Sequence, residues 1–349
     1  MKPPTEGLLV ISSDPKDIGA AVRQLLGDAL AYLYPAALRA AAGAGIADHL
    51  ADGPLTAEEL ARRSGVDSGH LRRLLRFLAT RGVFSEQPDG SFALTTAASV
   101  LRRDSPAPLR NLVLLFTDEM YWRPAGRLDE TVRRGTTAFD TIFGAQIFEH
   151  LSKDPAKNEL FVDAMADLSV LEHTGIAESY DFPASGTVVD VAGGLGGMLQ
   201  SVLVRNPGLR GVLVDRSEVL ERHRMTDPAV AGRFELAEAD FFAKLPSGAD
   251  IYLLKRILHD KSDEEAVRIL QTCRAAMNES ARLLVIDIVV PPAGAEQPNP
   301  TSDVLMMTVF EGKERTEEEL AKLMSAAGLR ISRVVATPSA MSITEVVAL

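Results

Sequence analysis

A histidine and an aspartate, His259 and Asp260, stand next to each other where an apolar segment gives way to a helix-like one. The segment is DIYLLKRILHDKSDEEAVRIL, residues 250–270, which begins like a buried strand and ends like a capped helix. Because imidazole titrates near neutral pH, a histidine in this position can exchange protons with a bound molecule. The pair is therefore either an ordinary turn or part of an active site.

A glycine-rich segment precedes it, in VVDVAGGLGGMLQSVLVRNPGLRGVLVD. A predicted strand ends in Asp190, glycines follow at 193, 194, 196 and 197, and a helix begins near Met198. Such glycines let the backbone approach a ligand and present N–H groups at a helix N-terminus. Asp215, at the end of the next strand, can accept both hydroxyls of a ribose. The pattern indicates a nucleoside-containing cofactor, either NAD or S-adenosylmethionine.

The spacing of these glycines favours S-adenosylmethionine. It is not the G-x-G-x-x-G of NAD sites, and an Asp just before the glycines is more typical of methyltransferases. Asp240 and Phe241, at the end of the third strand, suit an adenine, because a carboxylate can reach the amino group while a ring or N–H meets the base edge. A simple strand-end turn is the alternative for that pair.

Strands and helices that alternate from residue 186 onward must position these groups. The strands are near-continuous apolar runs, which predicts a parallel sheet covered by helices on both faces. They are residues 187–192, 211–215, 234–240, 250–255 and 282–290, with a closing pair within 329–349. The expected fold class is α/β, with a Rossmann-like sheet.

The N-terminal part predicts helices and one small hairpin. Residues 54–103 have the pattern of a helix-turn-helix plus wing, with Arg72, Arg73 and Arg76 on one helix face. DNA binding is the obvious interpretation, and a winged helix used only for assembly is the alternative. Residues 25–50 are too apolar all round for a lone surface helix, which predicts burial against a second subunit.

Composition narrows the class of protein. The net charge of −11 over 349 residues argues against a nucleic-acid partner for the whole chain. The single cysteine, Cys273, excludes an intrachain disulfide, and its place on an apolar helix stripe predicts a core position. Acids open the helix after Asp260, but helix starts are commonly acidic, so no metal is expected. Without any run of about 20 apolar residues, the chain is expected in the cytoplasm and away from membranes.

Residues 105–178 predict a helical connector with many aromatic side chains. Each of them taken alone is most simply a core residue. As a group between two domains they suit the wall of a pocket for a flat apolar substrate. They are Phe116, Tyr121, Trp122, Phe143, Phe148 and Phe161. The expected domains are 1–104 (winged-helix dimerisation), 105–178 (connector) and 179–349 (cofactor-binding and catalytic).

Taken together, the motifs resemble a known family. VVDVAGGLGG, LVD, EADFF, LLKRILHDKSDEEAVRIL and GKERTEEEL are similar to those of the dimeric, winged-helix, S-adenosylmethionine-dependent O-methyltransferases. This family includes plant caffeate-type enzymes and bacterial antibiotic-pathway enzymes such as carminomycin 4-O-methyltransferase. The resemblance covers nearly the whole chain. It implies a homodimer, S-adenosyl-L-methionine as methyl donor, S-adenosyl-L-homocysteine as product, and no metal.

The resemblance also implies roles for particular residues. His259 is the implied base, Asp287 and Glu314 are the acids that bracket it, and Asp260 is a further candidate at the site. The implied cofactor contacts are Ser169, Asp190, Gly193, Gly194, Gly196, Asp215, Asp240, Phe241 and Lys255. The implied substrate-binding residues are Phe161, Met165, Met306 and Phe310.

Four features depart from the family pattern. Ala192 stands where the family usually has Gly, and Lys261 stands where an aromatic residue normally follows His-Asp. Asp287 is one methylene shorter than the usual Glu. The segment FEGKERT, residues 310–316, replaces the commoner Gly-Gly-Lys and so changes the pocket floor.

The expected reaction transfers a methyl group from the sulfonium to a hydroxyl oxygen while His259 takes the proton. Since a phenol of pKa ~10 is mostly protonated at neutral pH, a positioned imidazole helps by ~10²–10⁴-fold. The resemblance implies an aromatic or quinone acceptor from antibiotic biosynthesis, and 7-O-methylation of a mitomycin is the most specific expectation. The alternatives are a ligand-sensing DNA-binding regulator, an NAD-dependent oxidoreductase and a methyltransferase-fold enzyme with altered chemistry.

Overall fold

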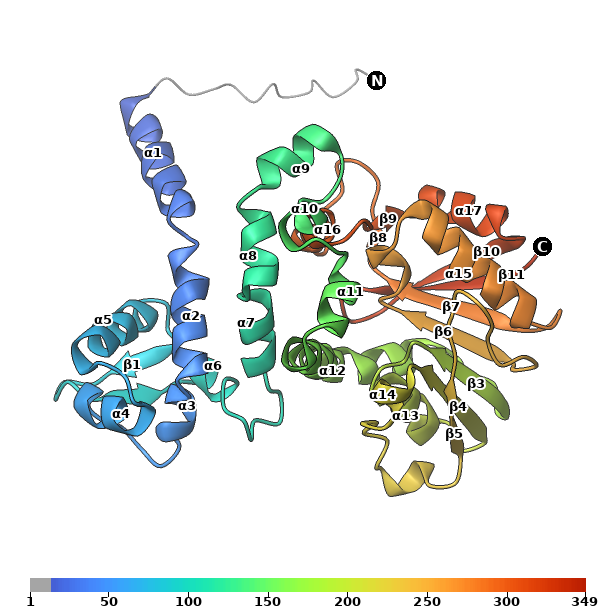
Figure 1. Ribbon diagram of the computed structural model, residues 1–349, viewed down its shortest axis with the longest axis horizontal. Coiled ribbons are helices and arrows are strands. Elements are labelled where there is room, and N and C mark those ends of the chain that lie inside the picture. The colour runs from blue at the N-terminus through green and yellow to red at the C-terminus, as the bar shows by residue number, and fades with distance from the viewer. Residues whose placement is uncertain (1–13) are drawn as a thin grey trace, which may run out of the picture. The chain divides into compact units, whose positions relative to one another are not determined.

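The structure is a computed structural model that describes residues 14–349. The chain divides into two compact units at Ser105/Pro106, and each is considered by itself (Figure 1). The connector helices belong to the same unit as the large sheet. In the described residues no helix is both long and apolar enough to cross a membrane.

The first unit is helical with one hairpin. Helices α4 and α5 are followed by the antiparallel pair β1–β2, which is the predicted helix-turn-helix plus wing. Its elements are α1 (Pro15–Ala29), α2 (Leu33–Gly43), α3 (Ile46–His49), α4 (Ala57–Ser64), α5 (Ser68–Ala79), β1 (Phe84–Glu86), β2 (Phe92–Leu94) and α6 (Thr96–Ser99).

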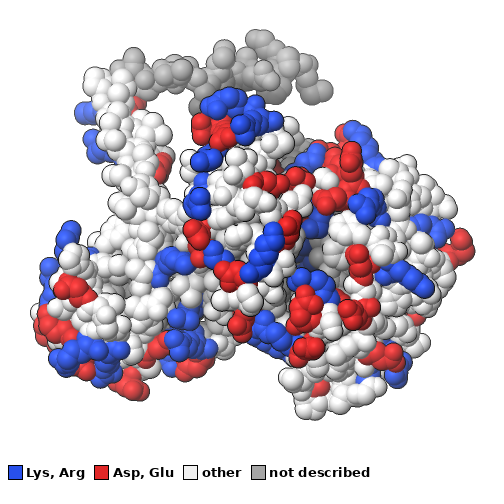
Figure 2. Space-filling model, viewed as in Figure 1, with Lys and Arg blue, Asp and Glu red and all other residues white. Residues whose placement is uncertain are grey.

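The charged face of α5 is largely neutralised within this unit. Arg72 donates to Glu58 at 2.8 Å, and Arg76 donates to Glu86 at 2.8 Å. Figure 2 shows basic and acidic side chains interleaved over the visible face of this unit, without a continuous basic patch. A duplex needs a basic surface, so this pattern favours assembly over DNA binding.

Helix α1 has an apolar surface that is not buried within the described chain. None of its residues is buried, and Ile18, Leu25 and Leu26 are at least half exposed, at 50%, 68% and 61%. Contiguous exposed apolar side chains of this kind mark an interaction surface. Of residues 25–50, for which a second subunit was expected, Leu25 and Leu26 belong to this exposed surface, whereas Ala41, Ile46 and Leu50 are buried within the unit itself.

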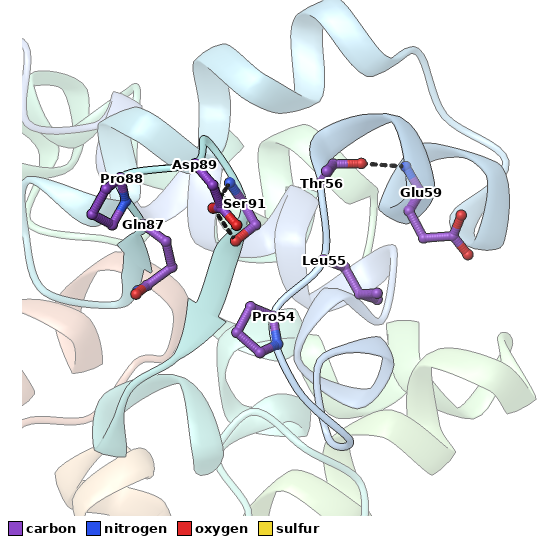
Figure 3. Close-up of a pocket in the computed structure, with 8 residues that line it drawn as sticks. All are labelled: Pro54, Leu55, Thr56, Glu59, Gln87, Pro88, Asp89 and Ser91. Carbon is purple, nitrogen blue, oxygen red and sulfur yellow. Dashed lines mark hydrogen bonds between the residues drawn. The ribbon is translucent and has the colours of Figure 1, made fainter.

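A shallow hollow in the same unit, of about 740 Å³, lies between the loop before α4 and the β1–β2 turn (Figure 3). Thr56 accepts the N–H of Glu59 there, and Asp89 accepts the N–H and hydroxyl of Ser91. These bonds cap a helix and close a turn. The hollow is lined by Pro54, Leu55, Thr56, Glu59, Gln87, Pro88, Asp89 and Ser91. We assign the hollow no ligand, because the hydrogen bonds of its lining side chains stabilise the local helix and turn.

The second unit is built on a seven-stranded sheet with the order β10-β11-β7-β6-β3-β4-β5. Strands β3 to β7 pair in parallel, and only β11 runs against its neighbours. The strands are β3 (Gly186–Val191), β4 (Leu209–Asp215), β5 (Phe234–Glu238), β6 (Ile251–Lys255), β7 (Arg282–Asp287), β10 (Leu329–Ala336) and β11 (Ser342–Ala348). The predicted α/β class with a Rossmann-like sheet is confirmed.

Two strands are shorter than predicted. β5 ends at Glu238, so Asp240 and Phe241 lie in the loop that follows. The run 282–290 breaks after Asp287 and resumes as the short strand β8 (Val289–Val290), which pairs with β9 (Arg315–Thr316). The break has a consequence for the site, because the β8–β9 pair brings the segment around Glu314 to the end of β7.

Helices cover both faces of the sheet and form the connector. They are α7 (Arg110–Phe116), α8 (Glu119–Ala125), α9 (Leu128–Arg134), α10 (Phe139–Phe143), α11 (Ile147–Ser152), α12 (Pro155–Ser179), α13 (Gly197–Arg205), α14 (Ser217–Leu220), α15 (Asp263–Ala276), α16 (Pro300–Val309) and α17 (Glu317–Ala326). Two short 3-10 helices, η1 (Pro228–Val230) and η2 (Leu258–Asp260), complete the unit.

Alternate strand residues enter different cores, which is why the strands are apolar throughout. In β6, Tyr252 and Leu254 pack with α15 and α17, while Ile251 and Leu253 pack with α12 and α13. Cys273 of α15 is fully buried in the first of these cores, as predicted. A sheet buried on both faces is rigid, and its strand ends can hold a site in fixed geometry.

Candidate active site

The candidate residues gather at the carboxyl ends of the parallel strands. Asp190 lies in β3 just before its end, Asp215 ends β4, Lys255 ends β6 and Asp287 ends β7. His259 follows β6 directly, in η2. The carboxyl edge of an open α/β sheet is where such folds bind ligands. The topology therefore brings together residues that are up to 97 positions apart in the chain (287 − 190).

The glycine loop between β3 and α13 requires its glycines. Gly194 and Gly196 have φ of 60° and 84°, a region that residues with a side chain rarely adopt. A Cβ on Gly193 would lie 2.6 Å from the carboxyl carbon of Asp190. Ala192 adopts φ 53° without being glycine, so the departure from the family pattern leaves the backbone conformation in place at a cost in strain.

Two carboxylates flank this loop. Asp215 accepts the N–H groups of Gly194 at 2.9 Å and Arg216 at 2.8 Å, which fixes the loop to the end of β4. Asp190 is buried, its Oδ2 has no hydrogen-bond partner in the described chain, and burial raises its pKa to about 7. A tight glycine turn, a helix N-terminus and an unsatisfied buried oxygen fit a cofactor that brings its own donors.

The structure does not choose between the two interpretations of Asp240 and Phe241. Asp240 accepts the N–H of Phe242 at 2.8 Å, as in a strand-end turn. The residue is exposed, and the centroids of the Phe241 and Phe242 rings lie 4.8 Å apart. The adenine contact remains a prediction.

Lys255 belongs to a buried polar cluster that the sequence did not reveal. It donates to Ser169 at 3.0 Å and pairs with Glu172 at 3.0 Å, both on α12. Arg256, at φ 57°, pairs with the same Glu172 at 2.5 Å. Burial favours the neutral form of Glu172, but the two cations outweigh it and lower its pKa. Glu172 thus ties α12 to the end of β6.

His259 is held by Glu314. Its Nδ1 lies 3.0 Å from Glu314 Oε1, which also accepts the hydroxyl of Ser302 at 2.6 Å. Both the histidine and the glutamate are buried, at 7% and 4% exposed. With Nδ1 bound to a carboxylate, Nε2 is the nitrogen that can accept a proton.

Asp287 acts on His259 by charge. Neither of its carboxylate oxygens has a hydrogen-bond partner in the described residues, in keeping with its shorter side chain, and burial raises its pKa to about 6. Burial opposes a charged imidazole, but Asp287 and Glu314 outweigh that effect, so the pKa of His259 lies above its ordinary value. The two acids favour the imidazolium that forms when the histidine takes a proton.

Arg315, next to Glu314, holds the backbone of the histidine turn. This buried guanidinium donates to the carbonyl oxygens of Leu258 at 2.6 Å and Lys261 at 2.8 Å, and to Asp263 at 2.8 Å. Gly312 permits the close approach, because a Cβ there would overlap the carbonyl oxygen of His259. Consecutive residues thus fix the ring and the backbone of one turn, and the GKERT motif by itself gives no sign of this role of Arg315.

Replacing Arg315 with lysine is expected to lower kcat by about tenfold or more while leaving cofactor affinity unchanged. A compact ammonium cannot reproduce the planar guanidinium fork that reaches all three acceptors, so the histidine loses its position. Steady-state kinetics and calorimetric titration with the cofactor measure the two effects. Arg330→Lys, on the exposed face of β10, is the matched control. Full turnover in the Arg315 variant would remove its positioning role.

Asp260 and Lys261 form an adjacent ion pair at 3.4 Å. Asp260 is buried, which raises its pKa against the opposing effect of Lys261. The Lys261 ammonium lies 4.1 Å from the centroid of the Phe148 ring. The lysine therefore fills the aromatic position of the family pattern with a cation stacked on an aromatic ring.

The four expected substrate-binding residues lie in one cluster. The cluster contains Phe161 and Met165 of α12, Met306 of α16, and Phe310, which follows α16 directly. Phe148 joins them, with ring centroids 5.9 Å from Phe161 and 6.0 Å from Phe310. Phe148 and Phe161 of the connector thus pack with the expected substrate-binding residues, and their role as the wall of a substrate pocket stays a prediction. In the described residues no group of three or more His, Cys, Asp or Glu is arranged to hold a metal ion.

Comparison with known proteins decides which cofactor and chemistry this geometry serves. Residues 126–330 match the O-methyltransferase domain family, and residues 28–104 match the O-methyltransferase dimerisation domain. The chain is an O-methyltransferase of this family. It is 36% identical over 336 residues to the mitomycin biosynthesis 6-O-methyltransferase of Streptomyces lavendulae. The alignment covers 93% of this chain and 95% of that relative.

Solved O-methyltransferases share the whole fold. CalO1, a methyltransferase of calicheamicin biosynthesis with S-adenosyl-L-homocysteine bound, is 46% identical with a TM-score of 0.82, covering 97% of this chain and 100% of that one. NcsB1, from neocarzinostatin biosynthesis, was solved with S-adenosylmethionine and 2-hydroxy-5-methyl naphthoic acid. It is 36% identical with a TM-score of 0.77, covering 90% of this chain and 96% of that one. The O-methyltransferase described here uses S-adenosylmethionine, which settles the choice that the glycine loop left open.

Proposed function

We propose that this O-methyltransferase methylates a hydroxyl oxygen of an aromatic or quinone secondary metabolite, with His259 as the general base. The observation that carries the proposal is the buried His259–Glu314 pair at 3.0 Å. It orients the imidazole through Nδ1 and leaves Nε2 to take a proton. The conclusion that this is methyl transfer to oxygen rests on the family.

The chain's residues have three tasks in this reaction. The glycine loop and Asp215 hold the cofactor, which supplies a methyl group on a sulfonium. The aromatic wall around Phe161 holds the acceptor ring, and such alignment of reacting atoms can be worth about 7–11 kcal/mol. His259 removes the hydroxyl proton, while Glu314 and the charge of Asp287 stabilise the imidazolium. The same proposal includes contacts to the cofactor by Ser169, Asp190, Asp240, Phe241 and Lys255.

The acceptor class is supported by the relatives. One acts in mitomycin biosynthesis, and another was solved with a hydroxynaphthoic acid. We therefore propose a fused aromatic or quinone acceptor, with the C7 oxygen of a mitomycin as the most specific candidate. We also propose a homodimer, supported by the dimerisation-domain match and the exposed apolar side chains of α1. A cytoplasmic location and the three-part division at 104 and 178 stay predictions.

The direct test is a product screen by mass spectrometry with S-adenosylmethionine that carries a deuterated methyl group. The panel holds hydroxynaphthoates, naphthols, hydroxyquinones and a mitomycin. Transfer of the labelled methyl to an acceptor oxygen, located by fragmentation, is the expected result. Binding of these acceptors without any labelled product would contradict the proposal.

The pH dependence follows from the raised pKa of His259. The base must be neutral, so kcat/KM is expected to fall as pH drops, with a midpoint above the pH at which an unperturbed histidine titrates. Glu314→Gln removes a charge that favours the imidazolium, so this midpoint should move to lower pH while the maximal rate falls. Profiles of the wild type and of Glu318→Gln, an exposed control on α17, complete the measurement. A midpoint that stays fixed in Glu314→Gln would contradict the assignment.

A further inference from the structure

Lys261 places a positive charge beside the acceptor wall. It is the second residue after His259, and its ammonium lies 4.1 Å from the centroid of the Phe148 ring. Phe148 in turn contacts Phe161 and Phe310, at centroid distances of 5.9 and 6.0 Å. The ammonium therefore borders the aromatic side chains expected to hold the acceptor and belongs to the chain segment that carries the base.

The charge of Lys261 is only partly compensated in the described chain. Its side chain is 12% exposed, and its carboxylate partner is Asp260 at 3.4 Å, an ion-pair distance that is longer than a charge-assisted hydrogen bond. An ammonium carries three N–H donors, and a ring face accepts them only weakly. Burying an ammonium costs free energy unless its donors are satisfied. Asp260 and the Phe148 ring do not satisfy all three donors, so a bound molecule that accepts from them would be stabilised.

The other cations near the site are already committed. Lys255 and Arg256 both pair with the buried Glu172, and Lys255 also donates to Ser169. Arg315 bonds the backbone of the histidine turn. Of these four cations, Lys261 is therefore the one whose donors are left for an anionic group on the acceptor.

We propose that Lys261 binds a carboxylate carried by the acceptor ring next to its reacting hydroxyl. This inference rests on the proposed function and narrows the acceptor to an aromatic hydroxy acid, which then replaces the mitomycin as the most specific candidate. The ring lies against Phe148, Phe161 and Phe310, its carboxylate pairs with the ammonium, and its hydroxyl is presented to His259. A lysine at this position selects by charge, whereas an aromatic residue there selects by stacking alone.

The test measures binding separately from turnover. Calorimetry compares 1-hydroxy-2-naphthoate with its uncharged carboxamide, using protein saturated with S-adenosyl-L-homocysteine. The wild type is expected to bind the carboxylate about tenfold or more tighter, the gain expected from a charge-assisted contact. Lys261→Met should lose this preference while binding the carboxamide within about twofold of wild type, and Lys261→Arg should keep most of it. Lys322→Met, on the exposed face of α17, is the control.

Two results would overturn the inference: equal affinities for the two probes in the wild type, or a preference that survives in Lys261→Met. Failure of the naphthoate to bind would overturn it as well. The product screen separates this inference from the proposed function. A lysine-dependent preference without methylated product contradicts the proposed function alone, whereas methylated product without the preference contradicts the carboxylate site alone.

Discussion

Replacing His259 with alanine is expected to lower kcat by ~10²–10⁴-fold, the usual contribution of a positioned general base. The acceptor hydroxyl then has to lose its proton to water, and Glu314 and Asp287 are left with no imidazolium to stabilise. Cofactor affinity should stay within about twofold of wild type, because no cofactor-binding group is changed. Stopped-time product analysis and calorimetric titration with S-adenosylmethionine measure the two quantities.

A matched control for this variant is His70→Ala, since His70 is exposed in the N-terminal unit. Loss of turnover in the His259 variant with intact cofactor binding supports the base assignment. Near-normal turnover on an acceptor whose hydroxyl has a phenolic pKa of ~10 would show that His259 is a structural residue at a strand end.

Replacing Asp215 with alanine is expected to weaken S-adenosylmethionine binding on the order of 100-fold, because charge-assisted hydrogen bonds contribute about 1.5–3 kcal/mol each. The carboxylate accepts the N–H groups of Gly194 and Arg216, so its loss frees the glycine loop as well as removing the ribose acceptor. Turnover at saturating cofactor should fall much less. Isothermal titration of the cofactor and kcat at saturation test both parts.

Glu218→Ala is the control for Asp215, because Glu218 is an exposed acid a few residues further on that pairs with Arg216. Unchanged cofactor affinity in the Asp215 variant would exclude the ribose role.

The parts of the fold that could be predicted from sequence are those with a local signal. Both faces of β6 are buried, so the residues from Ile251 to Leu254 are apolar without interruption. Such a run predicts a strand of a parallel sheet. The turn before α13 needs glycine at positions 194 and 196 because φ is positive there, and the glycine-rich sequence predicts such a turn. Asp215 follows from the same logic, since it ends a recognisable strand.

The supporting residues of the site have no such signal. Arg315 and Glu172 act on residues 57 and 83 positions away, numbered from Leu258 and Lys255 (315 − 258 and 255 − 172), so only the tertiary structure shows their partners. Ser302 follows a Pro-rich loop and looks like surface, yet it donates to Glu314. The end of β7 also has no sequence signal, because the break after Asp287 arises from the pairing of β8 with β9 and the run 282–290 is apolar on both sides of it.

The departures from the family pattern are interpretable only with the structure. The shorter Asp287 gives up a hydrogen bond to His259 but keeps its charge in the cluster. Lys261 replaces an aromatic side chain with a cation that stacks on Phe148. Sequence alone could show that these positions differ, but not what the substituted groups contact.

The central claim, that His259 takes the proton of the acceptor hydroxyl, is tested most directly by the rate ratio between wild type and His259→Ala across acceptors of graded acidity. Single-turnover methyl transfer is measured for each acceptor with both enzymes. The ratio should rise from near one for hydroxyquinones that are already ionised to ~10²–10⁴ for phenols of pKa ~10. A ratio that is the same for every acceptor would contradict the claim.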